Sequence, residues 1–242
     1  MYFAAMLIFS HPNGTNSGCY FYFEEANYMN NQTKKITTYA MLCALAYVVV
    51  VVGRVPVVLF LKYDPKDIVI ALGGLIWGPM TSFVVSVVVS IIEMFTISEN
   101  GILGCIMNII STCSFACTAA AIYKKRRTLS GAVIGLLMGS LTMIAVIMLW
   151  NYLIAPIYMG YPREAVAKLL LPAFLPFNVL KAGLNAAFTF LLYKPVTTAL
   201  RKTGYLSESS AKQDKKPIGL WLISCAVIIT CILFILSLNG II

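Results

Sequence analysis

The chain consists of long apolar runs separated by short polar breaks. A helix that crosses a membrane needs about 20 apolar residues to span about 30 Å of hydrocarbon. This pattern predicts an all-α integral membrane protein, with a six-transmembrane-helix bundle followed by a seventh, C-terminal hydrophobic helix. The apolar segments left after cutting at charged and Pro/Gly clusters are 36–53, 67–78, 80–98, 101–123, 129–158, 170–193 and 218–242.

Two of these segments contain signals about their own ends. The short segment 67–78 runs into Trp77-Gly78-Pro79, which predicts a tight turn, because proline can begin a helix but cannot continue one. The segment 129–158 is longer than one crossing, so we expect it to be tilted or broken near Pro156. No strand alternation is present, and none is expected, since an open sheet edge leaves backbone groups unsatisfied in lipid.

The polar breaks divide the chain into four parts. We expect an N-terminal extension at 1–33, the six-helix membrane domain at 34–203, a polar cytoplasmic linker at 204–217 and the extra transmembrane segment at 218–242. The first residues have no basic start and no small-residue cleavage site, so a signal peptide is not expected. Met29 precedes a polar, basic stretch typical of a start, and we hypothesise that the 28 residues before it are dispensable.

Charge explains how the segments are oriented. Only 11% of the residues are charged and 60% are hydrophobic, against about 25% charged in a soluble domain. Twelve of the 18 basic residues fall on one side of the six segments, which by the positive-inside rule is the cytoplasmic side of the plasma membrane. The N-terminus is therefore expected in the cytoplasm, and the net charge of +9 indicates topology and contact with the lipid bilayer, not nucleic-acid binding.

Several kinds of chemistry are excluded by what the chain lacks. One His and seven Cys without a Cys-x-x-Cys pair give neither a zinc site nor Cys/His catalysis. We therefore expect no metal, no cofactor and no enzyme activity. No phosphate-binding loop occurs either, so any work derived from ATP must come from another polypeptide.

The strongest candidate site lies in segment 170–193. Asn178 and Lys181 are three residues apart and share one helix face, and a lysine at membrane depth costs about 3 kcal/mol unless it is bound. Lys181 could bind a substrate, pair with Glu93 or extend to the membrane surface. Asn151, in segment 129–158, could bind the same substrate or join two helices by a hydrogen bond.

The outer connection from Leu59 to Asp67 is too apolar at its start for a solvated loop. Asp64 or Asp67 could cap the following helix, because Asp accepts the free N–H groups of a first turn. Tyr63 is not explained by capping. Together with Asn151, Asn178 and Lys181 it is expected to line an outward-facing cavity suited to a neutral, planar ligand that forms hydrogen bonds.

Three pieces of the chain are informative in combination. They are Tyr63-Asp64-Pro65-Lys66-Asp67, Trp150-Asn151-Tyr152 leading to Pro156, and Leu175-Pro176-Phe177-Asn178-Val179-Leu180-Lys181. In this order, between about Lys34 and Leu200, they resemble the riboflavin-specific substrate-binding components (S components) of energy-coupling factor (ECF) vitamin transporters.

The resemblance implies a six-helix fold with both ends of the unit in the cytoplasm. In that family, side chains at the places of Asn151, Asn178 and Lys181 form hydrogen bonds with riboflavin, and the first outer loop covers the ligand. This chemistry is reasonable, because an Asn amide both accepts and donates whereas Lys only donates. The implied ligand-contacting residues are Asn151, Asn178, Lys181, Tyr63, Leu61, Lys62 and Asp64.

The resemblance also implies partners. Members of the family dock through an Ala-x-x-x-Ala face on an ECF transmembrane coupling protein, which works with two ATPase subunits. Ala40 and Ala44 have this spacing, although small residues four apart are also common in ordinary membrane helix packing. The front extension and the seventh segment depart from the family pattern.

Three other functions are open on the sequence. The chain could be the S component for another vitamin, or an ion-coupled secondary transporter that uses Glu93. It could also be an intramembrane Mg²⁺-dependent prenyltransferase, because Asp64-x-x-Asp67 is similar to a diphosphate-binding motif. Such an enzyme needs a second acidic cluster, which the nine acidic residues do not supply.

Overall fold

The computed structural model describes the backbone of residues 17–58, 61–98, 101–160, 162–202 and 218–238. The chain forms two compact units, Met1–Thr38 and Tyr39–Ile242, which are described separately. The linker expected at 204–217 lies outside the described residues. The elements in chain order are α1 (Ser17–Gly53), β1 (Val55–Val58), β2 (Leu61–Tyr63), α2 (Lys66–Trp77), α3 (Pro79–Thr96), α4 (Gly101–Lys125), α5 (Leu129–Met159), α6 (Arg163–Leu169), the π-helix η1 (Leu170–Phe174), α7 (Leu175–Lys202) and α8 (Ile218–Leu238).

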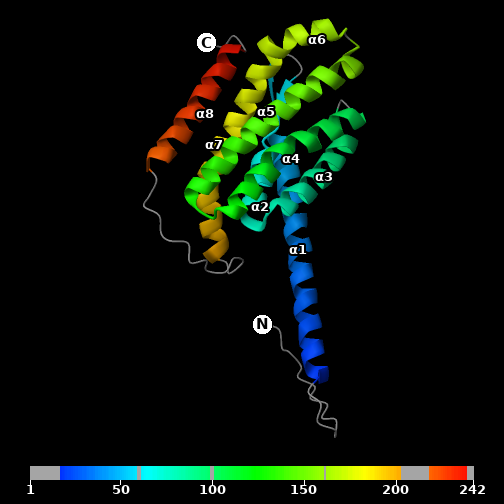
Figure 1. Ribbon diagram of the computed structural model, residues 1–242, viewed down its shortest axis with the longest axis vertical. Coiled ribbons are helices and arrows are strands. Elements are labelled where there is room, and N and C mark those ends of the chain that lie inside the picture. Colours follow the sequence, from blue (N-terminus) through cyan, green and yellow to red (C-terminus); the bar gives the residue numbers. More distant parts are fainter. Residues whose placement is uncertain (1–16, 59–60, 99–100, 161, 203–217, 239–242) are drawn as a thin grey trace. The chain divides into compact units, whose positions relative to one another are not determined.

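The second unit is a bundle of apolar helices (Figure 1). In it α4 packs on α2, α3 and α5, while α7 packs on α2, α5 and α8. Among the described residues, five helices are long and apolar enough to cross a membrane. They confirm the prediction of a multi-pass α-helical protein. The five stretches are Gln32–Gly53, Pro79–Thr96, Gly101–Lys125, Leu129–Ile157 and Arg163–Leu200.

The second predicted segment is a short helix. With 12 residues, α2 rises about 18 Å at 1.5 Å per residue, which is less than the hydrocarbon thickness. It is nevertheless the most enclosed helix of the bundle, since nine of its residues are buried. This helix therefore contributes buried packing to the bundle, and it places two buried charged residues, Lys66 and Asp67, at its start.

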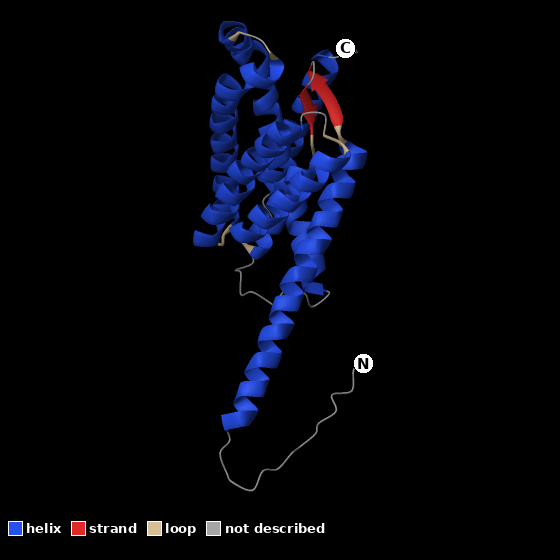
Figure 2. Cartoon of the chain, turned by 90° about the vertical axis from the view of Figure 1, so that its right-hand side faces the viewer, coloured by secondary structure: helices blue, strands red, loops and turns tan. Residues whose placement is uncertain are grey.

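The expectation that no strand would form is wrong. β1 and β2 form an antiparallel hairpin with Val55 opposite Tyr63 and Pro56 opposite Lys62, visible at one end of the bundle (Figure 2). The strands have only four and three residues, too few for alternation to be recognised. Proline is tolerated because a two-stranded hairpin has only edge strands.

The predicted turn at Trp77-Gly78-Pro79 is confirmed. Gly78 has a φ of 108°, a conformation that glycine adopts without a Cβ clash. Its N–H donates to the carbonyl of Gly74 at 2.8 Å, and Pro79 begins α3. The chain thereby reverses direction between α2 and α3 without a loop.

One predicted helix boundary is wrong, and the break considered near Pro156 is absent. The first helix begins at Ser17 rather than at residue 36, because the stretch from Ser17 to residue 35 holds no proline and only one glycine, Gly18. α5 continues unbroken through Pro156 to Met159, where Gly160 ends it in the left-handed conformation with φ 68°. Its 31 residues exceed one crossing without a break.

The interface between α4 and α5 depends on glycine. Gly131, Gly135 and Gly139 are spaced four apart on α5. A Cβ at Gly135 would lie 2.7 Å from the carbonyl oxygen of Ala119, and one at Gly139 would lie 2.5 Å from that of Phe115. The two backbones therefore approach to a distance that no larger residue allows, as is usual where helices associate in lipid.

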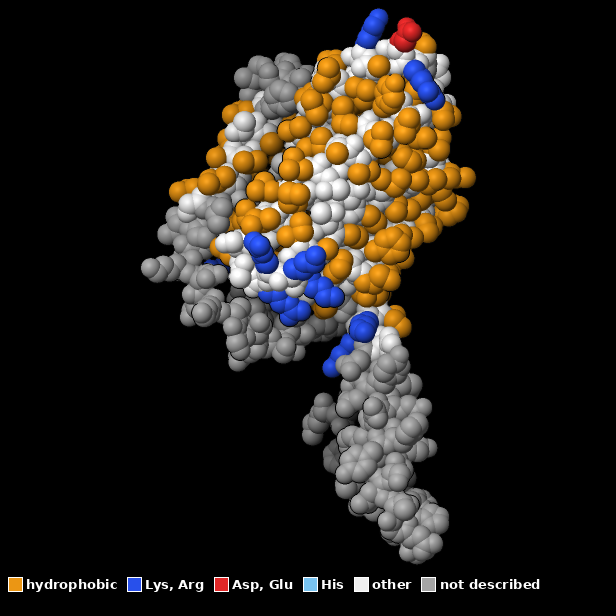
Figure 3. Space-filling model, viewed as in Figure 1, with side chains coloured by type: hydrophobic (Ala, Val, Ile, Leu, Met, Phe, Trp, Pro, Cys, Tyr) orange, Lys and Arg blue, Asp and Glu red, His pale blue; other side chains and the backbone are white. Residues whose placement is uncertain are grey.

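The surface of the bundle agrees with a membrane location. Apolar side chains cover its flank, and Lys and Arg side chains gather toward its ends (Figure 3). Large apolar residues such as Phe95, Leu137 and Leu171 are 58–78% exposed. Exposure on this scale is unfavourable in water but neutral in hydrocarbon.

Candidate functional site

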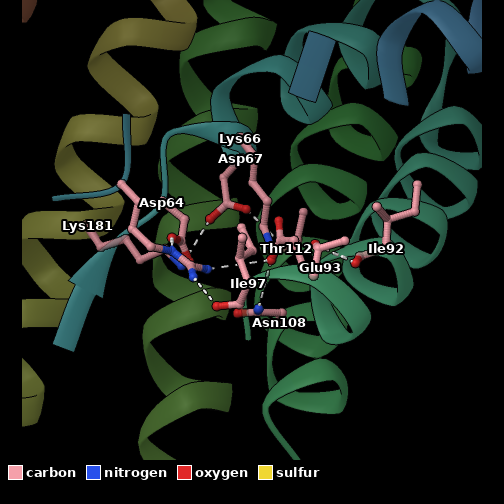
Figure 4. A network of polar contacts seen from close by, with 11 residues as sticks. Asp64, Lys66, Asp67, Ile92, Glu93, Ile97, Asn108, Thr112 and Lys181 are labelled. Carbon is pink, nitrogen blue, oxygen red and sulfur yellow. Dashed lines mark hydrogen bonds and ion pairs between the residues drawn. The ribbon is translucent and has the colours of Figure 1, made fainter. Parts of the chain in front are cut away.

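A buried polar network surrounds the start of α2 (Figure 4). The side chains of Lys66 and Asp67 are 1% and 0% exposed within it. Buried charges persist only when they are paired or hydrogen-bonded. The contacts of these two adjacent residues therefore determine how the site is built.

Asp67 connects α2 with α4 and α7. Its Oδ2 lies 3.1 Å from the Nζ of Lys181 and accepts from the Nδ2 of Asn185 at 3.2 Å. Its Oδ1 accepts from the hydroxyl of Thr112 at 2.7 Å. Three donors from two other helices thus satisfy one carboxylate.

Lys66 connects α2 with α3 instead. Its Nζ lies 2.5 Å from the Oε2 of Glu93, which also accepts from the Nδ2 of Asn108 at 3.3 Å. The Nη2 of Arg54 is 3.7 Å from the same oxygen. The predicted alternative in which Lys181 pairs with Glu93 is wrong, because Lys66 takes that position and Lys181 pairs with Asp67.

Asp64 holds the connection between β2 and α2 against Arg54, the residue that follows α1. It accepts from the Nε of Arg54 at 2.6 Å, and the Nη1 of Arg54 donates to the carbonyl of Ile97 at the end of α3. Burial opposes ionisation of Asp64, but Lys181, Lys66 and Arg54 together lower its pKa below the ordinary value. The carboxylate is therefore ionised at neutral pH.

The capping role predicted for Asp64 or Asp67 is wrong. The residue before α2 is Pro65, and no side chain caps the helix. Both carboxylates are instead occupied by cations and by donors from other helices. Tertiary packing outweighs a local cap here, because leaving a buried lysine unpaired costs more than leaving a helix end uncapped.

Tyr63 links β2 to the network. Its hydroxyl donates to the Oδ1 of Asn185 at 2.9 Å, and its ring belongs to a buried apolar cluster with Phe177, Leu180 and Leu184. Burial, followed by the carboxylates of Asp67 and Asp64, raises the pKa of Tyr63. The phenol stays protonated and remains a donor.

The two predicted asparagines lie on adjoining faces of α5 and α7. Asn178 is 3% exposed and donates to the carbonyl of Phe174 at 2.8 Å. Phe174 packs with Ala155 of α5 in one cluster. Asn151 is 3% exposed and lies one turn before Ala155, hence on the same face of α5.

Comparison with known proteins identifies the family. The family model described as "ECF transporter, substrate-specific component" matches residues 34–193. The chain belongs to this family. It is thus a component of a transporter and a multi-pass membrane protein, which confirms the transport prediction and contradicts the prenyltransferase alternative.

Individual relatives agree with the family. The chain is 26% identical over 180 residues to the riboflavin transporter RibU of Staphylococcus aureus, covering 71% of this chain and 94% of that protein. It is 26% identical over 177 residues to the riboflavin transporter FmnP of Bacillus subtilis, covering 67% and 92%. A solved structure described as the S component of a bacterial ECF transporter aligns with a TM-score of 0.60 at 26% identity, covering 70% of this chain and 99% of that one.

The S component contains a charge-balanced polar network. The described ion pairs join three cations to three carboxylates. Balanced charges suit a buried site, because each desolvated ion has a counter-ion within contact distance. The participants are Arg54, Asp64, Lys66, Asp67, Glu93 and Lys181.

Sequence reasoning gave no site role to Lys66 or Asn185, and it considered Asp67 only as a helix cap or as part of a diphosphate-binding motif. A signal was available in Glu93, a single carboxylate within an apolar span, which required a cation. The sequence does not identify that cation, because the fold could bring Arg54, Lys66 or Lys181 to Glu93. Only the packing of α2 against α3 decides among them.

The remaining predicted residues lie in β2 and in α1. Leu61 and Lys62 are in β2; Lys62 is partly exposed, and the Leu61 side chain lies outside the described ones. Ala40 and Ala44 are exposed on α1, whereas Ala46 is fully buried. The Ala-x-x-x-Ala face is therefore open on the second unit.

Proposed function

We propose that this S component binds riboflavin on the outer side of the plasma membrane and delivers it to the cytoplasm. The observation that carries the proposal is that two relatives, each aligned over more than 90% of its length, are both riboflavin transporters. In this proposal the N-terminus is cytoplasmic, in keeping with the positive-inside distribution. Energy comes from a transmembrane coupling protein with two ATPase subunits.

The proposed ligand site is built from the residues around α5, α7 and the hairpin. Asn151 and Asn178 supply amide donors and acceptors for the flavin ring and ribityl chain. An ammonium has three N–H donors, and the ion pair with Asp67 uses one of those of Lys181. Tyr63 and its neighbours Leu61, Lys62 and Asp64 cover the ligand from the hairpin side.

A titration of the purified full-length protein tests this function. The fluorescence of riboflavin is expected to fall when the protein binds it, with a dissociation constant between nanomolar and micromolar. Thiamine and folate should not compete for the site. Tighter binding of thiamine or folate would support the alternative of an S component for another vitamin. A colourless protein that binds no riboflavin would overturn the proposal.

One pair of variants tests the site. Asn178→Ala removes a buried amide and should weaken riboflavin binding by about 1–3 kcal/mol, because a polar group of the ligand is left unpaired. Val179→Ala is the matched control on the same helix, since Val179 is 50% exposed. Equal affinities of the two variants would contradict the assignment of Asn178.

A further inference from the structure

The C-terminal helix α8 is not accounted for by the family fold. The family match ends at residue 193, before α8 begins at Ile218. Yet α8 packs along α7 and also contacts β1 of the hairpin. The helix therefore adds contacts at the element that the proposed function places over the ligand.

One face of α8 carries these contacts. A Cβ at Gly183 of α7 would lie 3.8 Å from side-chain atoms of Val227 and Cys231. Ile228 and Cys231 pack against the apolar cluster that contains Tyr63 and Leu184. The spacing of three and four residues puts these side chains on a single helix face. Residues on the other face, such as Ile229 at 58% exposure, point away from the bundle.

The same cluster leads into the polar network. Tyr63 contributes its ring to the cluster and its hydroxyl to Asn185, whose amide contacts Asp67, the partner of Lys181. The packing of α8 against the cluster therefore supports Tyr63, the residue that anchors the hairpin to α7. The hairpin itself has only two short strands, and an isolated two-stranded hairpin is marginally stable.

We propose that α8 is a positioning element that holds the hairpin against α7 and thereby slows the release of the bound vitamin, with Ile228 as its principal contact. The ligand part of this inference rests on the proposed function. The structural part, that α8 stabilises the hairpin, does not.

Two isoleucines that follow each other on α8 provide a matched test in the full-length protein. Ile228→Ala removes the partly buried contact with the cluster, whereas Ile229→Ala removes the same atoms from the exposed face. In the ligand-free protein, Ile228→Ala is expected to raise hydrogen exchange about tenfold at the backbone amides of 55, 57, 58 and 61–63 while α3 to α5 keep their protection. Ile229→Ala should leave the hairpin unchanged.

Riboflavin dissociation provides the second measurement. Ile228→Ala should speed dissociation about tenfold, since lost packing in this cluster favours the opened hairpin, and Ile228→Val should give a smaller change in the same direction. The Val variant also serves as the test if the Ala variant does not fold.

The outcomes separate the two proposals. Equal exchange in the hairpins of Ile228→Ala and Ile229→Ala would overturn the role of α8, and unchanged dissociation with faster exchange would overturn its role in retaining the ligand. If the unaltered protein binds no riboflavin, the proposed function fails, while the exchange measurement still decides whether α8 holds the hairpin.

Discussion

The pairing of Asp67 with Lys181 is the residue-level feature on which the site depends. Both side chains are buried, at 0% and 7% exposure, and they belong to helices far apart in the chain. Removing one partner of a buried ion pair is strongly destabilising, whereas replacing both by apolar groups is often neutral. This asymmetry separates a role in folding from a role in ligand binding.

Lys181→Met is expected to lower the free energy of unfolding by about 3–5 kcal/mol, because Asp67 is left buried without a cation. The double variant Asp67→Leu with Lys181→Met should recover most of that loss. Unfolding in mixed micelles measures both. Asp67→Leu alone completes the comparison. If the losses of Lys181→Met and Asp67→Leu add up to the loss of the double variant, the two residues are not coupled and the assigned ion pair is wrong.

Ligand binding should respond differently to the same variants. The double variant is expected to regain stability but to bind riboflavin more weakly than the unaltered protein, since it lacks the ammonium that the proposed site uses. A fluorescence titration of the folded double variant with riboflavin measures this affinity. Full affinity in that variant would remove Lys181 from the ligand site and leave it a purely structural cation.

At the scale of elements, the contact between α4 and α5 is set by backbone proximity. Gly135 and Gly139 lie against the carbonyl oxygens of Ala119 and Phe115. In lipid, helix association relies on such close packing because the hydrophobic effect does not distinguish one helix from lipid tails. Small residues at these positions therefore hold the center of the bundle together.

Gly135→Leu should separate α4 from α5 and destabilise the protein by about 1–3 kcal/mol or more, the usual cost of overpacking. Gly183→Ala is the control, since a Cβ there meets its nearest neighbours at an ordinary 3.8 Å. Thermal unfolding in detergent compares the two. Equal melting temperatures would show that the α4–α5 contact tolerates larger residues.

At the scale of the whole molecule, the proposed function needs a surface for docking on the coupling protein that is separate from the proposed ligand site. Ala40 and Ala44 are exposed on α1, while Leu42, Cys43 and Ala46 on the same helix are buried in the core. One helix can thus pack into the bundle on one face and present small residues on another. Ligand binding and docking should accordingly be separable by mutation.

Ala44→Trp is expected to abolish co-purification with the coupling protein and its ATPases while riboflavin affinity stays within about twofold, because the bulky ring prevents close helix approach. Leu137→Trp, at an exposed position on α5, should leave both unchanged. A co-purification assay with a parallel titration measures the two properties. Loss of riboflavin binding in Ala44→Trp would indicate a fold defect instead of a docking defect.

Local features of the chain were predictable because they depend on neighbours in sequence. The apolar segments follow from the energy of placing side chains in hydrocarbon, and the turn at Gly78 follows from what glycine and proline allow in the backbone. The family resemblance rested on short motifs such as Phe177-Asn178-Val179-Leu180-Lys181, and the match over 34–193 confirms the family. The hairpin was missed because its strands are too short to show a period.

The ion-pair partners required the tertiary structure. Asp67 and Asn185 are 118 residues apart, and Lys66 and Glu93 are 27 apart. Any of three cations could have neutralised Glu93, and both Asp64 and Asp67 were plausible helix caps. The choice was made by packing, because the cost of an unpaired charge inside the bundle exceeds any local preference. The sequence by itself therefore determined the membrane fold and its family, and the tertiary structure decided which buried charges meet.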